Sequence, residues 1–319
     1  MAVFTPVTVH ELADFLTGYD VGTAINFKGI AEGDQNSNFL LETTRGRYFL
    51  TLYEERVAEA DLPWYLAFMA HLAAKGLPVP GPIPDRQGNS LTRLNGKPAC
   101  LIEFLNGVSV SEASPADAHA VGAALARMHV AAGDFTPVLA NALGPASWAA
   151  RTARCNGRLA EIDPALPDAV AAGLAVVPHW PGDLPRCTIH ADLFPDNVLM
   201  LDGKVTGLID FYFACTDLRA FDVAVTHAAW CFSSDGRRFF PERAAALMAG
   251  YASVVTLSPD ELAALPLLGM GAALRFTLTR AYDWLNTPAD ALVTRKDPMA
   301  FARRLQWYAG ASPQQVLGA

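Results

Sequence analysis

The sequence changes character near residue 106, and this change constrains the fold more than any other feature of the chain. Before it, short β-rich runs alternate with turn residues; after it, alanine and leucine recur at helical spacing. We therefore expect an α+β protein with an N-terminal antiparallel β-sheet lobe over residues 1–105 and a larger, mostly α-helical lobe over residues 106–319. A chain of 319 residues is long enough for two lobes of ordinary size.

The first lobe is expected to hold two helices beside its sheet. Thr8 and Glu11 have the spacing of a capping box, which predicts a short amphipathic helix at the start of the chain. A second helix is expected over residues 59–75, because apolar residues recur there at helical spacing up to Gly76. The expected strands lie at residues 24–31, 36–43 and 47–55, followed by two more that meet around Asn95-Gly96.

The second lobe is expected to be helical except for one β-like stretch at residues 187–210. That stretch consists of apolar runs around the turn sequence LDGK, and we expect a buried hairpin. The helical patterns start at Ser114 and Pro115 and continue at residues 146–161, 167–177, 218–232, 241–256 and 259–285.

The charge and cysteine content exclude several classes of protein. A net charge of −8 with scattered lysines argues against nucleic acid as a partner, because such binding depends on clustered cations. The five cysteines form no C-x-x-C pair, which favours buried reduced thiols over disulfides or a zinc site. No stretch reaches the roughly 18 apolar residues of a membrane span, and the first residues do not resemble a signal peptide. We expect a cytoplasmic protein that does not associate with membranes.

Four polar residues interrupt the apolar β-like stretch: His190, Asp192, Asn197 and, after the turn, Asp210. A carboxylate can accept a hydroxyl proton, and carboxylate and amide oxygens are the hard ligands that Mg²⁺ prefers. The bland alternative is a hairpin whose polar residues only cap turns. In order, spacing and topology, however, the set resembles the catalytic loop and the metal-binding aspartate of protein kinases.

With Ala191 where protein kinases have arginine, the pattern is similar to the aminoglycoside phosphotransferase and choline kinase family, whose members phosphorylate small molecules. The resemblance implies a two-lobed protein-kinase-like fold and the use of ATP and Mg²⁺. It implies that Asp192 is the catalytic base and that Asn197 and Asp210 hold the metal. His190 is then expected to hold the loop by hydrogen bonds rather than to act as a base, with Asp196 a simple turn residue.

Further segments resemble the family's other conserved parts. Asp222, near the start of a helix, matches the aspartate that stabilises the catalytic loop. Glu103 and Leu105 lie where the hinge strand of a kinase hydrogen-bonds adenine through its backbone. Gly33, Asn36, Ser37 and Asn38 lie where the family's loop covers the phosphates, and small residues there let backbone N–H groups approach phosphate oxygens.

The third strand departs from the family pattern. It carries Thr51 where a kinase has the lysine that pairs with the α and β phosphates. Lys28 or Arg56 could supply this charge, or Mg²⁺ and backbone donors could replace it. The carboxylate partner of that lysine stays open between Glu59 and Asp61.

Over nearly its whole length the chain looks like the bacterial homoserine kinases of this family. That resemblance implies transfer of the γ-phosphate of ATP to the side-chain hydroxyl of L-homoserine, giving O-phospho-L-homoserine for threonine biosynthesis. A related kinase acting on choline, ethanolamine or an aminoglycoside is the alternative. A non-catalytic nucleotide-binding pseudokinase is a further one, because of the missing lysine. The sequence does not indicate an oligomeric state.

A zwitterionic substrate needs a partner for each of its charges, because an unpaired charge in a closed cleft is costly. Arg275 and Arg280 are candidates for the carboxylate, although both could instead form salt bridges inside the helical lobe. Asp34 and Asp217 are candidates for the ammonium group, and Asp217 could alternatively cap the following helix.

Overall fold

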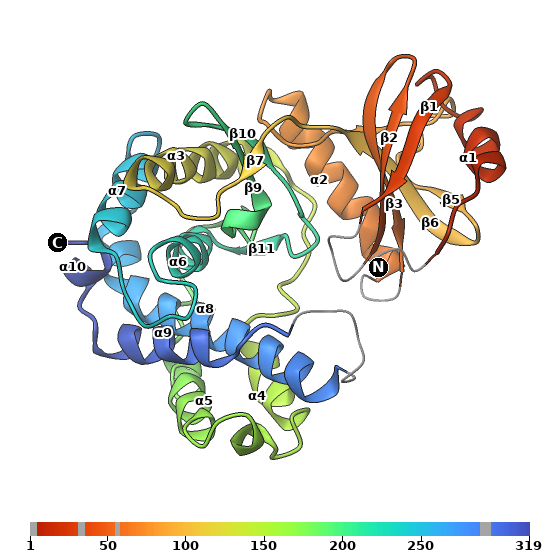
Figure 1. Ribbon diagram of the computed structural model, residues 1–319. Helices are drawn as coiled ribbons and strands as arrows, with labels where there is room; N and C mark the ends of the chain where they lie inside the picture. Colours follow the sequence, from red (N-terminus) through yellow and green to blue (C-terminus); the bar gives the residue numbers. More distant parts are fainter. Residues whose placement is uncertain (1–4, 31–35, 55–57, 288–294) are drawn as a thin grey trace. The chain divides into compact units, whose positions relative to one another are not determined.

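The structure is a computed structural model that describes residues 5–30, 36–54, 58–287 and 295–319. The chain forms two compact units (Figure 1). Unit 1 comprises Met1–Gly107 and Thr206–Tyr212, and unit 2 comprises Val108–Val205 and Phe213–Ala319. All five cysteines are free thiols; four are buried and Cys187 is half-buried.

Unit 1 contains the expected antiparallel sheet. Its strand order is β1-β2-β3-β6-β4, and β5 pairs with β6. The predicted turn at Asn95 and Gly96 is present: both residues have positive φ, 51° and 76°, as a tight hairpin between β5 and β6 requires. The strands are β1 Ala24–Gly29, β2 Asn36–Thr43, β3 Gly46–Tyr53, β4 Pro82–Ile83, β5 Thr92–Leu94 and β6 Lys97–Glu103.

Both predicted helices of unit 1 are present, α1 Val9–Leu16 with its capping box and α2 Leu62–Ala74, which follows the single-turn helix η1 Glu59–Asp61. Side chains of β3 alternate between the two faces of the sheet. Leu50 and Leu52 belong to one buried cluster with Leu12 of α1. The side chain of Tyr53 points to the opposite face of the sheet. Its hydroxyl forms a hydrogen bond with the hydroxyl of Tyr212, and the two oxygens are 2.8 Å apart.

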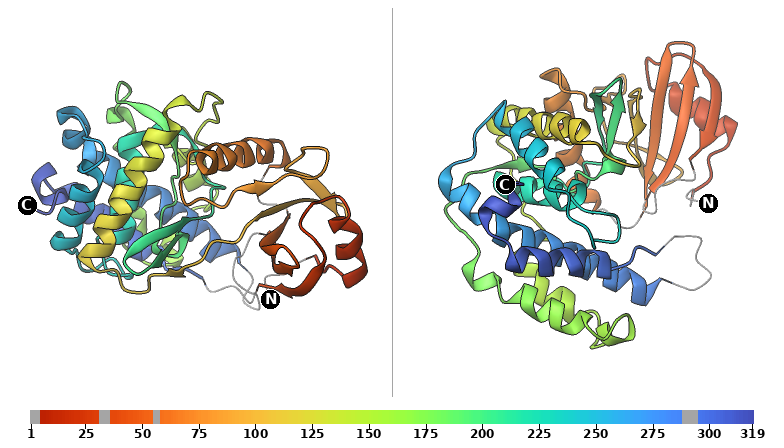
Figure 2. Two further views of the ribbon diagram at one scale, coloured as in Figure 1. Left: turned by 90° about the horizontal axis from the view of Figure 1, so that it is seen from above. Right: turned by 60° about the vertical axis from the view of Figure 1, so that its left-hand side comes forward.

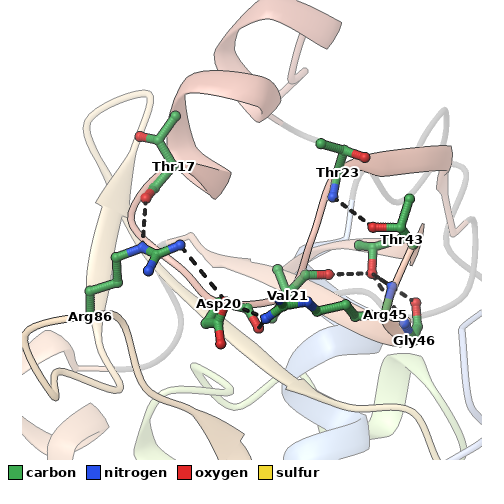
Figure 3. A network of polar contacts seen from close by, with 9 residues as sticks. Thr17, Asp20, Val21, Thr23, Thr43, Arg45, Gly46 and Arg86 are labelled. Atoms are coloured by element: carbon green, nitrogen blue, oxygen red, sulfur yellow. Dashed lines mark hydrogen bonds and ion pairs between the residues drawn. The ribbon is translucent and has the colours of Figure 1, made fainter.

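A network of polar contacts ties the end of α1 to the turn between β2 and β3 (Figure 3). Arg86 donates to the carbonyl of Thr17, and Arg45 pairs with the carboxylate of Asp20. The hydroxyl of Thr43 is buried and donates to the carbonyl of Val21 over 2.5 Å. Because the ion pair is exposed and worth little, the buried Thr43 bond is the stronger constraint on this corner.

Unit 2 is built around the long helix α8, which contacts five other helices. The expected helices are present, except that the one predicted at residues 146–161 ends at Ala153, before Asn156 and Gly157 at positive φ. Helices α9 and α10 were not expected from the sequence. Helix α8 is long and apolar enough to cross a membrane, yet most of it is buried inside unit 2, as in a core helix. The helices are α3 Pro115–Ala131, α4 Pro145–Ala153, α5 Leu166–Leu174, α6 Arg219–Trp230, α7 Pro241–Ala252, α8 Pro259–Asn286, α9 Met299–Gly310 and α10 Pro313–Val316, with single-turn helices η2 Ala132–Asp134, η3 Leu159–Glu161, η4 Val177–His179 and η5 Pro195–Asn197.

Helices α3 and α7 lie side by side at unusually close range (Figure 2). A Cβ atom on Gly122 of α3 would lie 2.1 Å from the carbonyl oxygen of Leu247, and one on Gly250 of α7 would lie 2.0 Å from that of His119. Because each glycine touches backbone of the other helix, neither position accepts a side chain without moving the helices apart.

The β-like stretch is not one simple hairpin. Only β9 Val198–Leu201 and β10 Lys204–Leu208 form the predicted hairpin, through Asp202 and Gly203 at positive φ, and β7 Val108–Ser109 adds a third strand beside β9. The first strand, β8 Arg186–Ile189, pairs instead with β11 Cys215–Leu218. The expectation was wrong for β8 because its partner lies beyond the hairpin, where no local turn signals the pairing.

Candidate active site

The loop between β8 and β9, residues 190–197, is folded by its own polar groups. Asn197 donates from Nδ2 to the backbone carbonyl of Asp192 over 2.8 Å and to its carboxylate over 3.1 Å. The N–H of Asp192 donates to Nδ1 of His190 over 3.2 Å. Ala191 has φ +62°, a conformation that L-residues seldom adopt. Such a strained position is typical of functional sites.

Asp222 of α6 accepts hydrogen bonds from the backbone of this loop, as the family resemblance implies. Its carboxylate accepts the N–H of His190 over 2.8 Å and that of Ala191 over 2.7 Å. It also lies 3.0 Å from Nε2 of His129 on α3, whose Nδ1 lies 2.9 Å from the hydroxyl of Tyr251 on α7. Burial alone would raise the pKa of Asp222, but these hydrogen bonds outweigh it and lower the pKa below its usual value.

Asp192 has an unusual electrostatic environment. Its burial, with the nearby charge of Asp196, raises the pKa of its carboxyl group to about 6, even though Arg275, Lys296 and the bond from Asn197 act in the opposite direction. The guanidinium of Arg275 lies 3.9 Å from the carboxylate. A carboxylate with this pKa is ionised at neutral pH yet basic enough to accept a proton, which suits a general base.

Arg275 of α8 lies against the loop. It is 1% exposed, donates to the carbonyl of Ala191 and covers the ring of Phe276, with its guanidinium carbon 4.6 Å from the ring centroid. Its Nε is buried and has no hydrogen-bond partner among the described residues. The expected grip of Arg275 on a substrate carboxylate stays a prediction, and its observed contacts are with the backbone and carboxylate of the loop.

Arg280, five residues further along α8, lines a cavity of about 410 Å³ within unit 2. Its Nη1 donates to the carbonyl of Asp297 over 3.2 Å, and burial lowers its pKa to about 10, so it stays charged at neutral pH. The cavity reaches the 190–197 loop, since Phe194, Pro195 and Asp196 line it, together with Ser111, Lys296 and Arg304.

Asp217 does not cap α6. It is the third residue of β11, which pairs with β8 as far as Leu218, and Leu218 is the residue at the helix cap. The buried carboxylate accepts from Asn141 over 2.7 Å and lies 3.2 Å from Arg186. Its predicted contact with substrate stays a prediction. Asp34, the other candidate for the ammonium group, lies outside the described residues.

Three of the residues expected to cover the phosphates begin β2 rather than forming a turn. Asn36 and Ser37 are buried, and the side chain of Asn38 accepts from the hydroxyl of Thr51 over 2.9 Å. Thr51 is buried in the middle of β3, where it replaces the expected lysine. Gly33, the fourth residue of this set, lies outside the described residues.

Among the remaining nucleotide-side candidates, Glu103 lies on an inner strand of the same sheet and Lys28 lies on the edge strand β1. The carboxylate of Glu103, at the end of β6, accepts from the N–H of Gly81 over 3.1 Å, and Leu105 follows in a segment without regular structure. Lys28 is exposed on β1, whereas Arg56 lies outside the described residues.

The two carboxylates left open near α2 have different surroundings. Glu59 forms an exposed ion pair with Arg93, and Asp61 precedes the first residue of α2. Neither the ion pair of Glu59 nor the position of Asp61 indicates which carboxylate would pair with a phosphate-binding cation.

The two residues expected to hold a metal ion, Asn197 and Asp210, belong to different units. Asn197 uses its amide nitrogen for both contacts with Asp192, which leaves the carboxamide oxygen as its potential ligand. Asp210 is exposed, belongs to unit 1 and has φ +64°. In the described part of the chain, no group of three or more His, Cys, Asp or Glu side chains could hold a metal. These hard oxygen donors fit Mg²⁺, which keeps water and phosphate ligands beside one or two protein groups.

Three residues near the loop were missed by sequence reasoning. His129 lies on the buried face of α3 and contacts Asp222. In the sequence, this role is signalled only by a histidine among apolar helix residues. Lys296 and Arg304 reach the cavity from the segment before α9 and from α9 itself, which the periodicity analysis did not identify.

Comparison with known proteins gives a consistent result. Residues 26–265 match the family model described as "Phosphotransferase enzyme family". The chain is 50% identical to the homoserine kinase of Granulibacter bethesdensis, covering 98% of both chains, and 52% identical to that of Acidiphilium cryptum, covering 97% of both. The solved structure of the amicoumacin kinase hAmiN superposes with a TM-score of 0.68 at 14% identity, covering 95% of this chain and 93% of that chain. This likeness confirms the fold class predicted from the sequence.

Proposed function

Because the chain belongs to the phosphotransferase enzyme family, and within it to the homoserine kinases, we propose that Asp192 is the base that activates the side-chain hydroxyl of L-homoserine for attack on the γ-phosphate of ATP. The product is O-phospho-L-homoserine, an intermediate of threonine biosynthesis. The enzyme is thus a kinase with an alcohol acceptor, and kinases of this family use ATP.

The environment of Asp192 is the observation that carries this proposal. The loop around it is held by Asp222 and by the amide of Asn197, so the carboxylate is preorganised. Its pKa of about 6 suits proton transfer from an alcohol at neutral pH. His190 contributes by holding the loop through its ring nitrogen and its backbone.

Mg²⁺ is the second cofactor in this proposal, with the carboxamide oxygen of Asn197 and the carboxylate of Asp210 as its protein ligands. When bound, the ion neutralises charge on the phosphate oxygens. The hard oxygen chemistry of the two side chains supports this assignment.

The nucleotide belongs to the lobe of residues 1–105. Gly33, Asn36, Ser37 and Asn38 lie beside the phosphates, and the backbone near Glu103 and Leu105 receives the adenine. Support comes from the positions of Asn36, Ser37 and Asn38 at the start of β2 and of Glu103 at the end of β6.

The helical lobe of residues 106–319 supplies all but one of the proposed partners of the acceptor. Arg275 and Arg280 are the proposed partners of its carboxylate, and Asp34 and Asp217 those of its ammonium group. The exposure of Arg280 to the cavity supports its part in this assignment. The enzyme acts in the cytoplasm on a small molecule, without nucleic acid or membrane as a partner.

A substrate panel tests the proposal directly. Purified protein is incubated with ATP, Mg²⁺ and homoserine, choline, ethanolamine or an aminoglycoside, and ADP release is measured. Homoserine should be the preferred acceptor, and leaving out Mg²⁺ should stop turnover. Asp192→Asn and Asp210→Asn should each abolish homoserine-dependent ADP release in a folded protein. Full turnover in either variant would refute the assigned mechanism, and equal rates for all acceptors would refute the assigned substrate.

A further inference from the structure

The cavity beside the 190–197 loop is strongly cationic. Arg280, Lys296 and Arg304 line it, against a single carboxylate, that of Asp196. Lys296 lies 3.8 Å from that carboxylate, and both side chains are more than half exposed. Among the described residues, no carboxylate forms an ion pair with Arg280 or Arg304.

Arg304 is the most informative of these cations. It is 3% exposed, and its Nη2 donates only to the backbone carbonyls of Ser233 and Ser234. Its Nε is buried and has no hydrogen-bond partner within the described part of the chain. A guanidinium withdrawn from water with no carboxylate in direct contact is costly, so an anionic ligand in the cavity would stabilise it.

Aromatic packing connects these cations to the loop that carries Asp192. Both guanidiniums lie over the ring of Phe301, that of Arg304 at 4.1 Å from the centroid and that of Arg280 at 4.5 Å. Phe194 of the loop packs at 5.9 Å from the same ring. The ring of Phe301 therefore contacts both the cations of the cavity and the 190–197 loop.

We infer that this cavity is the subsite for the head group of an α-amino acid, in which Arg280 and Arg304 bind the carboxylate and Asp196 binds the ammonium group. The inference rests on the proposed function, which makes a hydroxylated amino acid the acceptor. It keeps Arg280 as a partner of the carboxylate, puts Arg304 in place of Arg275, and puts Asp196 in place of Asp34 and Asp217 as the partner of the ammonium group.

The same charges explain discrimination between acceptors. A cavity with three cations and one acid attracts a carboxylate and repels a ligand that carries only positive charge. Choline and ethanolamine offer no carboxylate, so they leave both guanidiniums unpaired. Homoserine satisfies the arginines and the acid at once.

The carboxylate subsite is tested by combining a variant that lacks the proposed arginine with a substrate that lacks the carboxylate. With Arg280→Gln, KM for L-homoserine should rise at least about 30-fold, because one partner of a desolvated charge pair is lost. With 3-amino-1-propanol, which lacks the carboxylate, KM should change by less than about threefold. Arg304→Lys, which keeps the charge but loses the planar fork, should show the same selectivity to a smaller degree. Arg303→Gln, one residue away on α9 and not lining the cavity, is the matched control and should change neither KM.

A second variant tests the ammonium subsite. Asp196→Asn should raise KM for homoserine and for 3-amino-1-propanol alike, but not for 4-hydroxybutyrate, which lacks the amine. Assays at pH 8 keep Asp192 ionised in every variant, so that the loss of the neighbouring charge at Asp196 does not alter the base.

The outcomes separate this inference from the proposed function. Equal losses of activity with homoserine and with 3-amino-1-propanol in Arg280→Gln would overturn the carboxylate assignment, but the proposed function would stand as long as the wild-type protein phosphorylates homoserine. If the wild-type protein does not turn over homoserine, the proposed function fails, and calorimetric titration with L-homoserine then decides the subsite alone. Binding by wild type that Arg280→Gln abolishes would support it, and no binding by wild type would overturn it.

Discussion

Burial and neighbouring charges determine how tightly the carboxyl group of Asp192, in the 190–197 loop, binds a proton. Asp192 loses hydration on burial and is repelled by Asp196, while Arg275 partly compensates. The folded state therefore binds a proton at this carboxyl group more tightly than the unfolded chain does, with a pKa of about 6 instead of about 4. Both the pH dependence of activity and the stability of the protein follow from this difference.

The first prediction concerns the pH profile. Because a general base acts only when ionised, kcat/KM for homoserine should be level above pH 7 and fall below pH 6, approaching tenfold per pH unit. Initial rates at saturating ATP and Mg²⁺ between pH 5 and 8 measure it. A profile that stays flat down to pH 5 would show that no group with this pKa is required.

A second prediction follows from linkage. A raised pKa in the folded state means that Asp192 favours folding below the pKa of the unfolded chain and opposes it as pH rises through 6. At pH 7.5, Asp192→Asn should therefore increase the free energy of unfolding by about 1–3 kcal/mol while abolishing turnover. Urea titrations at pH 7.5 and pH 4 test this, since the gain should shrink at pH 4. A loss of stability at pH 7.5 would contradict the argument.

Asp222 has the opposite character, and a third prediction rests on it. Its hydrogen bonds lower its pKa, so it stabilises the fold above the pKa of the unfolded chain, and this contribution disappears as pH falls. Asp222→Ala leaves the N–H groups of His190 and Ala191 without an acceptor and should destabilise the protein by about 3 kcal/mol. It should also lower kcat more than it raises KM for ATP. Asp168→Ala, exposed in the first turn of α5, is the control and should cost less than about 1 kcal/mol.

At the scale of elements, local signals predicted most of the structure. The capping box at Thr8 predicted the start of α1, Ser114 and Pro115 predicted the start of α3, and the Asn95-Gly96 turn predicted the β5–β6 hairpin. Helix α9 was not predicted because the charged residue Arg304 lies on its buried face and interrupts the apolar periodicity. The pairing of β8 with β11 could not be inferred, because nothing local connects the two strands.

The close contact of α3 and α7 carries a fourth prediction. Gly250→Ala places a methyl group against the carbonyl of His119 and should destabilise the protein by about 2 kcal/mol. Gly133→Ala, where a Cβ meets nothing within 4 Å, should change stability by no more than about 1 kcal/mol in either direction. Denaturant titration of both variants measures the difference, and equal effects would show that the helices separate easily.

At the scale of the whole molecule, a buried histidine joins the end of the chain to the core of unit 2. His227 of α6 donates from Nε2 to the carbonyl of Val316 over 2.9 Å, and its Nδ1 lies 2.5 Å from the hydroxyl of Tyr308. Burial lowers its pKa to about 4, so the ring is neutral in the folded protein at physiological pH.

A fifth prediction uses this depressed pKa. Between pH 6.5 and 4 the unfolded chain takes up a proton at His227 and the folded protein does not, so stability falls as pH falls. At pH 5 the loss relative to pH 7.5 should be about 2 kcal/mol from this residue. His227→Gln should be less stable at pH 7.5, and the gap to wild type should narrow at pH 5. A constant gap would show that His227 does not titrate in this range.

The candidate site divides into a part that sequence could predict and a part that it could not. His190, Asp192 and Asn197 lie within eight residues, so their spacing is visible in the sequence, and the structure brings all three into one hydrogen-bonded loop. The cavity cations come from α8, α9 and the segment before α9, and Arg280 and Arg304 both lie over the ring of Phe301, where α8 packs against α9. Long-range packing of this kind leaves no local pattern.

The sheet unit is built from two separate pieces of chain. After Gly107 the polypeptide leaves unit 1, and it returns only for Thr206–Tyr212, whose Phe211 and Tyr212 pack against Phe68 and Tyr53. A protein truncated after residue 107 would therefore lack Phe211 and Tyr212, which pack against aromatic residues of the sheet unit. Transplanting this module into another protein requires either both stretches or a new linker that splices the returning one onto the first.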